Sequence, residues 1–227
     1  MKSNFEVWGT YRCERPTTGL ITHERSKLIS FHFDNHECDI HSFIKQLNPI
    51  AIINCIGVIK QRAEAKDVLS VVPINTLLPH QLQISAKNIG AKLIHISTDC
   101  VFCGSRGNYF EQDNADASDV YGLSKYLGEV TNKNSLTLRT SIIGHEIDSK
   151  ISLLEWFLSQ DKQIDGYTNA YFSGLPTNEV ARVILHILEE HTSLSGLYHL
   201  SAGKISKYDL LSIINKIYNK NLQIVPS

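Results

Sequence analysis

The sequence predicts an α/β protein with a doubly wound parallel sheet and a small C-terminal lobe. Two observations support this prediction. Short apolar strand candidates alternate with helical stretches along the 227 residues, and such alternation is typical of parallel sheets whose strands are joined by helices. The run Ile50–Ile56 is apolar through most of its length, as expected for a strand that is buried on both faces of such a sheet.

The first half of the chain supplies the early strands and two helices of this sheet. Asp39 is placed to cap a helix over Ile40–Leu47, and Pro49 ends it. A longer helix is predicted over about Val68–Asn88, with Pro79 expected to kink it and Gly90 to end it. The predicted strands are Phe5–Tyr11, Lys27–Phe33, Ile50–Ile56 and Lys92–Ser97.

The second half begins with a helix for which Asp119 is the expected cap. Leu123, Leu127 and Val130 follow at the spacing of one helical face, so we expect them to form its apolar side. Beyond Gly144 the pattern changes to helices with short connections. The elements predicted here are strands Leu136–Ile142 and Leu197–Leu200 and helices Ile151–Leu158, Asn178–Glu190 and Lys207–Lys220, the last two capped by Thr177 and Ser206.

Composition argues against several classes of protein. The formal net charge is −1, which gives no indication of binding to nucleic acid or to an anionic membrane. No apolar run approaches the roughly 20 residues of a membrane span, and Met1–Asn4 leads directly into a strand candidate rather than a signal peptide. Five cysteines form no repeated framework, which favours a reducing, cytoplasmic location.

The stretch Ile94–Glu129 carries the chemistry. An apolar strand ends in hydroxyl groups at Ser97 and Thr98, and a Gly-rich loop then leads to a helix that carries Tyr121 and Lys125. These two residues are four apart, so their side chains project from one helix face. A phenol beside an ammonium group is expected to have a lowered pKa. Thr98 is the hydroxyl placed to hold a carbonyl oxygen beside that phenol.

These residues resemble the extended short-chain dehydrogenase/reductase family, and most closely its dTDP-4-dehydrorhamnose reductase branch. That branch has a strand end like Ser-Thr-Asp-x-Val-Phe, then Gly-x-Tyr-x-Glu, then Tyr-Gly-x-Ser-Lys-x-x-Gly-Glu. The chain has Ser97–Phe102, Gly107–Glu111 and Tyr121–Glu129 in the same order. A lone Tyr-x-x-x-Lys is a weak signal, whereas this ordered combination in a strand–loop–helix context is strong. The resemblance covers most of the chain and implies a Rossmann-like fold.

The resemblance implies an NADP-dependent reductase of a 4-keto-6-deoxy nucleotide sugar. Tyr121 would give its proton to the developing alkoxide, Lys125 would lower the Tyr121 pKa and bind the nicotinamide ribose, and Thr98 would bond the same substrate oxygen. Dehydratase relatives have Glu where this chain has Cys100, which argues against dehydration. Two alternatives stay open: an epimerase of the same family, and a non-catalytic regulatory or interaction protein such as the regulatory subunit of methionine adenosyltransferase.

Further cofactor-binding positions follow from the same resemblance. Arg12, at the end of the second family strand, would meet the 2′-phosphate of NADP, although NAD stays open as the cofactor. The remaining expected positions are Asp34 near the adenine, Cys55, Ile56 and Gly57 on the nicotinamide side, and Asn75 as a brace of the central helix or of the site lysine. For Arg12, Asp34 and Asn75 the alternatives are a surface charge, a loop turn and a helix cap, respectively.

Residues 1–144 are therefore expected to bind the dinucleotide, and residues 145–227 to bind the sugar nucleotide while interleaving with the last sheet elements. One departure from the family is expected at the N-terminus. A dinucleotide-binding fold opens with a strand and a Gly-rich turn, whereas Gly9 and Gly19 are the only glycines before Gly57. We expect the first βα unit to be missing, which puts the cofactor affinity of this polypeptide in doubt.

Two groups of metal-binding residue types need weighing. His32, His36, Cys38 and His41 lie close together, but their spacing matches no standard zinc site, and chance clusters arise easily among ten histidines. The pair Cys100 and Cys103 follows a strand rather than opening a helix, and no second pair completes a zinc site. We therefore predict no metal site. A homodimer is left open.

Overall fold

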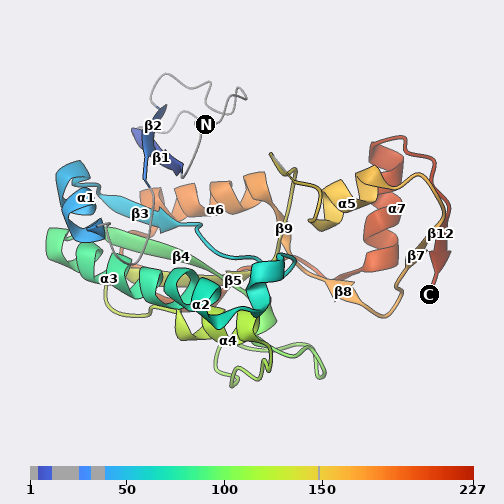
Figure 1. The fold of residues 1–227 in the computed structure, drawn as a ribbon, viewed down its shortest axis with the longest axis horizontal. Coiled ribbons are helices and arrows are strands. Elements are labelled where there is room, and N and C mark those ends of the chain that lie inside the picture. The colour runs from blue at the N-terminus through green and yellow to red at the C-terminus, as the bar shows by residue number, and fades with distance from the viewer. Residues whose placement is uncertain (1–4, 12–25, 32–38, 148) are drawn as a thin grey trace. The chain divides into compact units, whose positions relative to one another are not determined.

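The structure is a computed structural model that describes residues 5–11, 26–31, 39–147 and 149–227. The chain forms two compact units, Met1–Pro49 and Ile50–Ser227, which are described separately (Figure 1). Several positions singled out from the sequence lie outside the described residues, namely Arg12, Asp34, His32, His36 and Cys38.

The first unit contains a parallel strand pair and one helix. Strand β1 (Val7–Tyr11) pairs with β2 (Ser26–Ser30), so both predicted strands are confirmed, each over a shorter range, and β2 begins one residue earlier than predicted. Helix α1 (Ile40–Leu47) has the predicted bounds. Asp39 caps it by accepting hydrogen bonds from the backbone N–H groups of His41 and Ser42, which satisfies donors that the first turn leaves unpaired.

The second unit is organised around a four-stranded parallel sheet in the order β10-β5-β4-β3. Its strands are β3 (Ala51–Asn54), β4 (Lys92–Thr98), β5 (Ser135–Thr140) and β10 (Gly196–His199). This arrangement confirms the predicted parallel α/β fold. The expected burial of Ile50–Ile56 on both faces is wrong, because Ile50 and Ile53 are 72% and 41% exposed. β3 is an edge strand of this sheet and has a pairing partner, β4, on one side.

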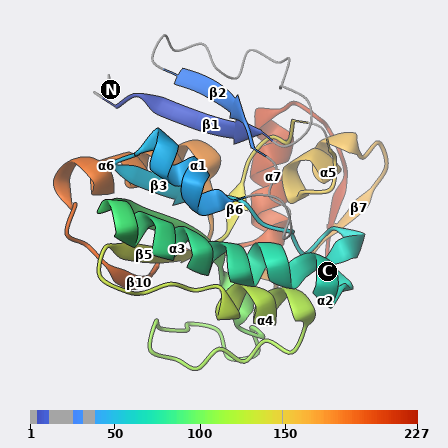
Figure 2. The ribbon, with the colours of Figure 1, turned by 60° about the vertical axis from the view of Figure 1, so that its left-hand side comes forward.

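Helices cover both faces of this sheet (Figures 1 and 2). The predicted long helix is present as α2 (Val68–Val71), a π-helical segment over Val72–Leu77, and α3 (Leu78–Ile89). Asp67 caps its start and the left-handed Gly90 ends it. The irregularity lies directly before Pro79, which has no N–H to donate to the carbonyl of Asn75 in this continuous helical run.

Helix α4 (Val120–Leu127) lies on the same face of the sheet as α3 and begins at the predicted cap Asp119, which accepts from Gly122 N. Its predicted apolar side is wrong, since Leu123 and Leu127 are 44% and 57% exposed. The helix instead buries Gly122, Ser124 and Lys125. A Cβ atom at Gly122 would meet the backbone carbonyl of Cys100, so α4 packs through small and polar residues.

The opposite face of the sheet is covered by α6 (Thr177–Glu190), whose Ile187 packs on Ile94, Leu136 and Leu138. This cluster forms a hydrophobic core whose burial stabilises the sheet by about 1.5–3 kcal/mol per side chain. The helix begins one residue earlier than predicted. Thr177 is its first residue rather than its cap, and its hydroxyl donates to the carbonyl of Ile143.

The C-terminal lobe has a core of its own. Helices α5 (Leu153–Ser159) and α7 (Lys207–Ile217) confirm two predicted helices, and Ser206 caps α7 as expected. Their residues Leu154, Phe157, Leu211 and Ile214 pack together. The short strands of this region are β6 (Ile142–Ile143) with β9 (Leu175–Pro176), β7 (Ile164–Gly166) with β12 (Ile224–Pro226), and β8 (Tyr171–Phe172) with β11 (Ile205–Ser206).

Strand β10 comes from beyond residue 144 yet pairs with β5 in the main sheet. The expected division of the chain at residue 144 stays a prediction. Two 3₁₀ turns, Ala63–Lys66 and Asp99–Val101, complete the elements. Across the described ranges, no helix combines the length and the apolar character that crossing a membrane requires.

Candidate active site

The site lies at the carboxyl end of β4, where Thr98 ends the strand and Asp99–Val101 forms a 3₁₀ turn. Thr98 Oγ1 accepts a hydrogen bond from Cys100 N at 3.1 Å, which fixes the hydroxyl at the strand end. The side chain of Tyr121, in the first turn of α4, is hydrogen-bonded to Thr98. The fold thus brings together the two hydroxyl groups that the sequence paired across a loop of more than twenty residues.

The electrostatics of Tyr121 differ from the sequence-based expectation. Burial raises the pKa of Tyr121 to about 12, and the negative charges of Asp99 and Asp119 add to this effect. The bond to Thr98 acts in the opposite direction. Lys125 was expected to lower this pKa, but the phenol pKa is raised, because loss of hydration disfavours the phenolate more than nearby groups stabilise it.

Lys125 is buried, with 5% of its surface exposed. Its Nζ donates a hydrogen bond to the carbonyl oxygen of Ile96 on β4 at 2.7 Å. Burial lowers the pKa of Lys125 to about 8, whereas the charges of Glu129 and Cys55 act to raise it. The ammonium is therefore a cation held against the sheet whose charge is sensitive to pH near neutrality.

The segment after β3 runs beside this lysine. A Cβ atom built on Gly57 would lie 3.9 Å from Lys125 Nζ and 3.3 Å from Asn75 Oδ1. Cys55 and Ile56 are exposed next to it. Because Gly57 has no side chain, the backbone leaves a cradle beside Lys125. Such close backbone approach fits a dinucleotide cofactor, and the assignment of Gly57 to the nicotinamide side stays a prediction.

Asn75 is fully buried in the π-helical segment and acts as a brace. Its Oδ1 accepts from Val58 N at 2.9 Å, and its Nδ2 donates to Val58 O at 3.1 Å and to Ser124 Oγ at 3.2 Å. These bonds join the segment after β3 to α4 at the turn that carries Lys125. The helix-cap alternative for Asn75 is wrong, since Asp67 and Gly90 cap the ends of this helical run.

A second link between the same two segments lies at the surface. Lys60 Nζ pairs with Asp119 Oδ2 at 2.9 Å, and both side chains are about half exposed. Asp119 also caps α4 through Gly122 N. An exposed pair of this kind contributes about 0–1 kcal/mol, so its effect is on the position of the segment after β3 rather than on overall stability.

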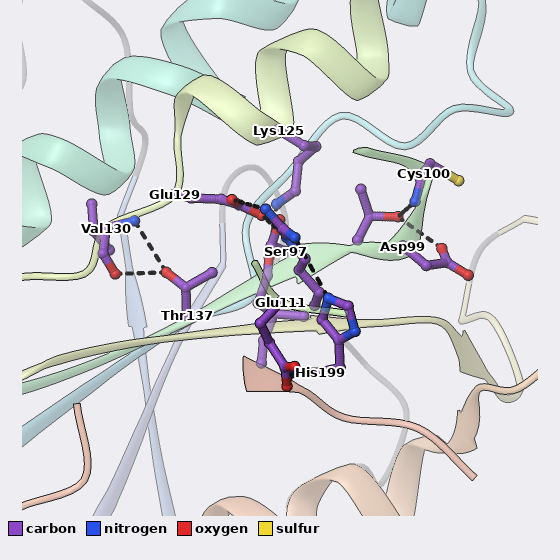
Figure 3. A network of polar contacts seen from close by, with 12 residues as sticks. Ser97, Asp99, Cys100, Glu111, Lys125, Glu129, Val130, Thr137 and His199 are labelled. Carbon is purple, nitrogen blue, oxygen red and sulfur yellow. Dashed lines mark hydrogen bonds and ion pairs between the residues drawn. The ribbon is translucent and has the colours of Figure 1, made fainter. Parts of the chain in front are cut away.

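A buried polar network lies beneath the site (Figure 3). Glu129 binds Arg139 through two hydrogen bonds, Nε to Oε1 at 2.7 Å and Nη2 to Oε2 at 2.8 Å, and the two side chains are 6% and 3% exposed. Ser97 Oγ donates to Glu129 Oε1 at 3.0 Å. The pairing of Glu129 with Arg139 was not predicted from the sequence. The signal was a charged residue inside the predicted strand Leu136–Ile142, because a buried arginine needs an anion.

Arg139 extends this network to the loop beyond β4. Its guanidinium lies 4.9 Å from the centroid of the Phe102 ring, and its Nη1 is 3.5 Å from His199 Nε2. Phe102 stacks on Tyr109 with centroids 4.3 Å apart. Glu111 Oε1 accepts a hydrogen bond from His199 N at 2.8 Å. The three motif segments found in the sequence therefore meet at one buried network.

The thiols and potential metal ligands form no further site in the described ranges. Cys100 and Cys103 are both free thiols, and Cys103 bonds Asp116 rather than its neighbour in the pair. Within the part of the chain that the structure describes, no group of three or more His, Cys, Asp and Glu side chains is arranged to hold a metal ion. The candidates Arg12 and Asp34 lie outside that part.

Comparison with known proteins defines the class. The family model described as RmlD substrate binding domain matches residues 23–226. Together with the Rossmann-like sheet and the Thr98, Tyr121 and Lys125 positions, this match places the protein in a known group. The chain belongs to the RmlD substrate binding domain family, within the extended short-chain dehydrogenase/reductases.

Particular relatives refine this assignment. The chain is 27% identical over 181 residues to the spore coat polysaccharide biosynthesis protein SpsK of Bacillus subtilis, covering 77% of the chain and 62% of SpsK. It is 24% identical over 202 residues to the Xenopus tropicalis methionine adenosyltransferase 2 subunit beta, covering 79% of the chain and 58% of that protein. The chain thus spans about three fifths of the length of these curated relatives.

Among solved structures, the chain resembles dTDP-4-dehydrorhamnose reductase from Bacillus anthracis, determined in complex with NADP. The TM-score is 0.73 and the identity 26%, and the match covers 88% of this chain and 76% of that one. The likeness therefore extends through both the sheet and the C-terminal lobe.

Proposed function

We propose that the protein is an NADPH-dependent reductase that acts on the 4-keto group of a 6-deoxy nucleotide sugar. The observation that carries this proposal is the convergence of Thr98, Tyr121 and Lys125 at the end of β4 in a chain of this family. The similarity to a reductase of this kind solved with NADP supports both the cofactor and the substrate class. NAD remains the alternative cofactor.

Tyr121 acts as the proton donor in this proposal. A donor must be protonated before the reaction, and a pKa of about 12 keeps the phenol protonated throughout the physiological range. The Thr98 hydroxyl, bonded to Tyr121, is placed to share the substrate oxygen. Donation to a developing alkoxide is favourable because an alkoxide is a stronger base than a phenolate. Positioned proton transfer of this kind contributes about 10²–10⁴-fold to the rate.

NADPH, when bound, supplies the hydride. Tyr121 and Lys125 would hold the nicotinamide ribose, and the backbone of Cys55, Ile56 and Gly57 would line the nicotinamide side. Asn75 keeps that backbone against α4 through its bonds to Val58 and Ser124. Residues 145–227, with the lobe built on α5 and α7, would bind the sugar nucleotide.

Cys100 bears on the choice among reactions of this family. In the dehydratase pattern a glutamate takes this position to assist removal of water. The Cys100 thiol has its pKa raised by burial and by Asp99, so it is neutral and a poor base at neutral pH. Reduction is therefore favoured over dehydration. Epimerisation uses the same hydride chemistry as reduction. The two reactions are distinguished by their products in an assay with NADPH and the 4-keto sugar.

A regulatory function is the second candidate. Lys125 is bonded to the backbone of Ile96, and the pKa of Tyr121 is raised rather than lowered. This pair is not poised as an activated phenol–ammonium couple. The similarity to methionine adenosyltransferase 2 subunit beta points in the same direction. In this reading the site binds a dinucleotide without turnover, and the fold serves as a binding module.

The test is an assay of the chain with NADPH and dTDP-4-keto-6-deoxy sugar, followed by absorbance and by chromatography of the products. The reductase proposal expects NADPH consumption equal to the formation of the 4-hydroxy sugar. An epimerase would yield a rearranged sugar without net NADPH consumption. NADPH binding without any change of the sugar would overturn the reductase proposal and favour the regulatory function.

A further inference from the structure

We infer that Glu129 is a positioning residue that keeps the Lys125 side chain charged, and that Arg139 holds Glu129 in that role. The inference concerns the buried pair of Glu129 and Arg139, to which the proposed function assigns no contact with substrate or cofactor. It deepens the proposed function, on which it rests where turnover is measured, but its main test is independent of turnover.

The Glu129 carboxylate is held by several hydrogen bonds. The carboxylate is gripped by Arg139 through two parallel hydrogen bonds of 2.7 and 2.8 Å, and Ser97 donates a third at 3.0 Å. Three donors from two neighbouring strands leave the carboxylate one well-defined position. Figure 3 shows the Lys125 side chain directed from α4 toward Glu129.

Groups from several segments of the chain surround the Lys125 side chain. Along the chain, Tyr121 precedes it by one turn of α4, and Glu129 follows it by four residues, just beyond the C-cap Gly128. From β4 it meets the Ile96 carbonyl and the neutral ring of His95, whose pKa burial lowers well below its usual value. From the segment after β3 it meets the Cys55 thiol. Glu129 is therefore the carboxylate of this environment.

The Glu129–Arg139 pair is better explained by its effect on Lys125 than by a contribution to stability. A buried ion pair such as Glu129–Arg139 is often no more stabilising than apolar residues of similar volume, because removing two charges from water offsets their attraction. Stability alone thus gives little reason for the pair. A carboxylate one helical turn beyond the site lysine has a specific effect, since it favours the charged form of an amine that burial would otherwise neutralise.

Arg139 also connects this pair to more distant parts of the site. Arg139 also contacts the Phe102 ring and His199, and His199 N bonds Glu111. The same arginine therefore ties the carboxylate beneath Lys125 to β10 and to the loop beyond β4. Movement of that loop would be transmitted to Glu129 through one guanidinium group.

The test is a titration of Lys125 by NMR, using the whole 227-residue chain labelled with ¹³C-lysine. The Cε resonance of Lys125 is assigned by its loss in Lys125→Met. In Glu129→Gln we expect the midpoint to fall by about one pH unit, so that roughly tenfold less of the lysine is charged at a given pH above the midpoint. Glu179→Gln, which removes a surface carboxylate paired with Arg182, is the matched control and should not move it.

Glu129→Asp keeps the negative charge of the carboxylate, so the Lys125 midpoint should return most of the way to the wild-type value. If Glu129→Gln does not fold, the double variant Glu129→Gln/Arg139→Met, which removes both charges of the pair, is titrated instead. A smaller fall of the Lys125 midpoint is then expected, because loss of the Arg139 cation acts in the opposite direction to loss of the carboxylate. A Lys125 midpoint equal to that of the wild type in the folded variant would overturn the inference. The titration tests this inference even if the wild type shows no turnover. An absence of turnover would contradict the proposed function alone. If it does turn over, the alkaline limb of the kcat profile should shift with the midpoint.

Discussion

Lys125 donates a hydrogen bond from Nζ to the carbonyl oxygen of Ile96 across 2.7 Å. This bond joins α4 to β4 two residues before Thr98, so the side chain that follows Tyr121 by one turn is anchored to the strand that ends in the site hydroxyl. The anchored amine is buried, and its pKa falls to about 8. The charge of Lys125, its position and the stability of the fold are therefore linked.

Lys125→Met should change how stability depends on pH. A folded-state pKa of about 8, below the usual 10.5, means that the unfolded chain holds the proton more tightly. Stability then rises with pH between these values. The wild type should gain up to about 3 kcal/mol relative to Lys125→Met from pH 8 to 10.5, with little change below pH 8. Tyr121 is present in both proteins and cancels. Urea unfolding at a series of pH values measures this difference, and a constant difference would contradict it.

Gly57→Ala should weaken NADPH binding without unfolding the protein. The added methyl group would lie 3.3 Å from Asn75 Oδ1 and 3.9 Å from Lys125 Nζ, filling the cradle proposed for the nicotinamide. We expect a loss of affinity of about tenfold or more, equivalent to 1.4 kcal/mol. Gly203→Ala, whose methyl would meet no atom within 4 Å, is the control. Fluorescence titration gives both affinities, and equal values would remove Gly57 from the cofactor site.

Arg12→Ala tests the choice between NADPH and NADH. If Arg12 reads the 2′-phosphate, the substitution removes a charge-assisted hydrogen bond worth on the order of 1.5–3 kcal/mol. NADPH affinity should then fall by that amount, while NADH affinity stays nearly constant. Titration with the two cofactors in parallel provides the measurement. Equal losses would identify Arg12 as a surface charge.

Local patterns predicted much of the fold. The bounds of α1 followed from Asp39 and Pro49, and α4 began at Asp119 as its capping pattern required. The burial of α4 could not be predicted in this way. Its leucines form the apolar stripe of a periodic pattern, yet the helix buries Gly122 and its neighbours because close packing against another backbone requires small residues. Such packing depends on segments distant in the sequence.

The candidate site shows the same limit. Its motifs placed Thr98 and Tyr121 close together, and the side chains are hydrogen-bonded. The sequence could not reveal that burial outweighs the effect of Lys125 on the phenol, because desolvation depends on the whole fold. Nor did it pair Glu129, just after α4, with Arg139 on β5, which the fold brings together from separate elements.

Thr98→Val should lower kcat and leave NADPH affinity unchanged, since it removes the hydroxyl that is bonded to Tyr121. Thr98 also caps the following 3₁₀ turn through Cys100 N, so some loss of stability, about 0.5–2 kcal/mol, is expected as well. Thr98→Ser retains the hydroxyl and should keep most of both properties. Steady-state kinetics and thermal unfolding of the two variants separate the effects. A valine variant with the turnover of the wild type would exclude Thr98 from the chemistry.

Tyr121→Phe tests the central claim most directly, because it removes the proposed proton donor and keeps the ring. The measurement is kcat for NADPH oxidation with dTDP-4-keto-6-deoxy sugar, alongside the NADPH dissociation constant. We predict that kcat falls by about 10²-fold or more while NADPH affinity hardly changes, since Lys125 is retained. Turnover close to that of the wild type would contradict the assignment of Tyr121 as the proton donor.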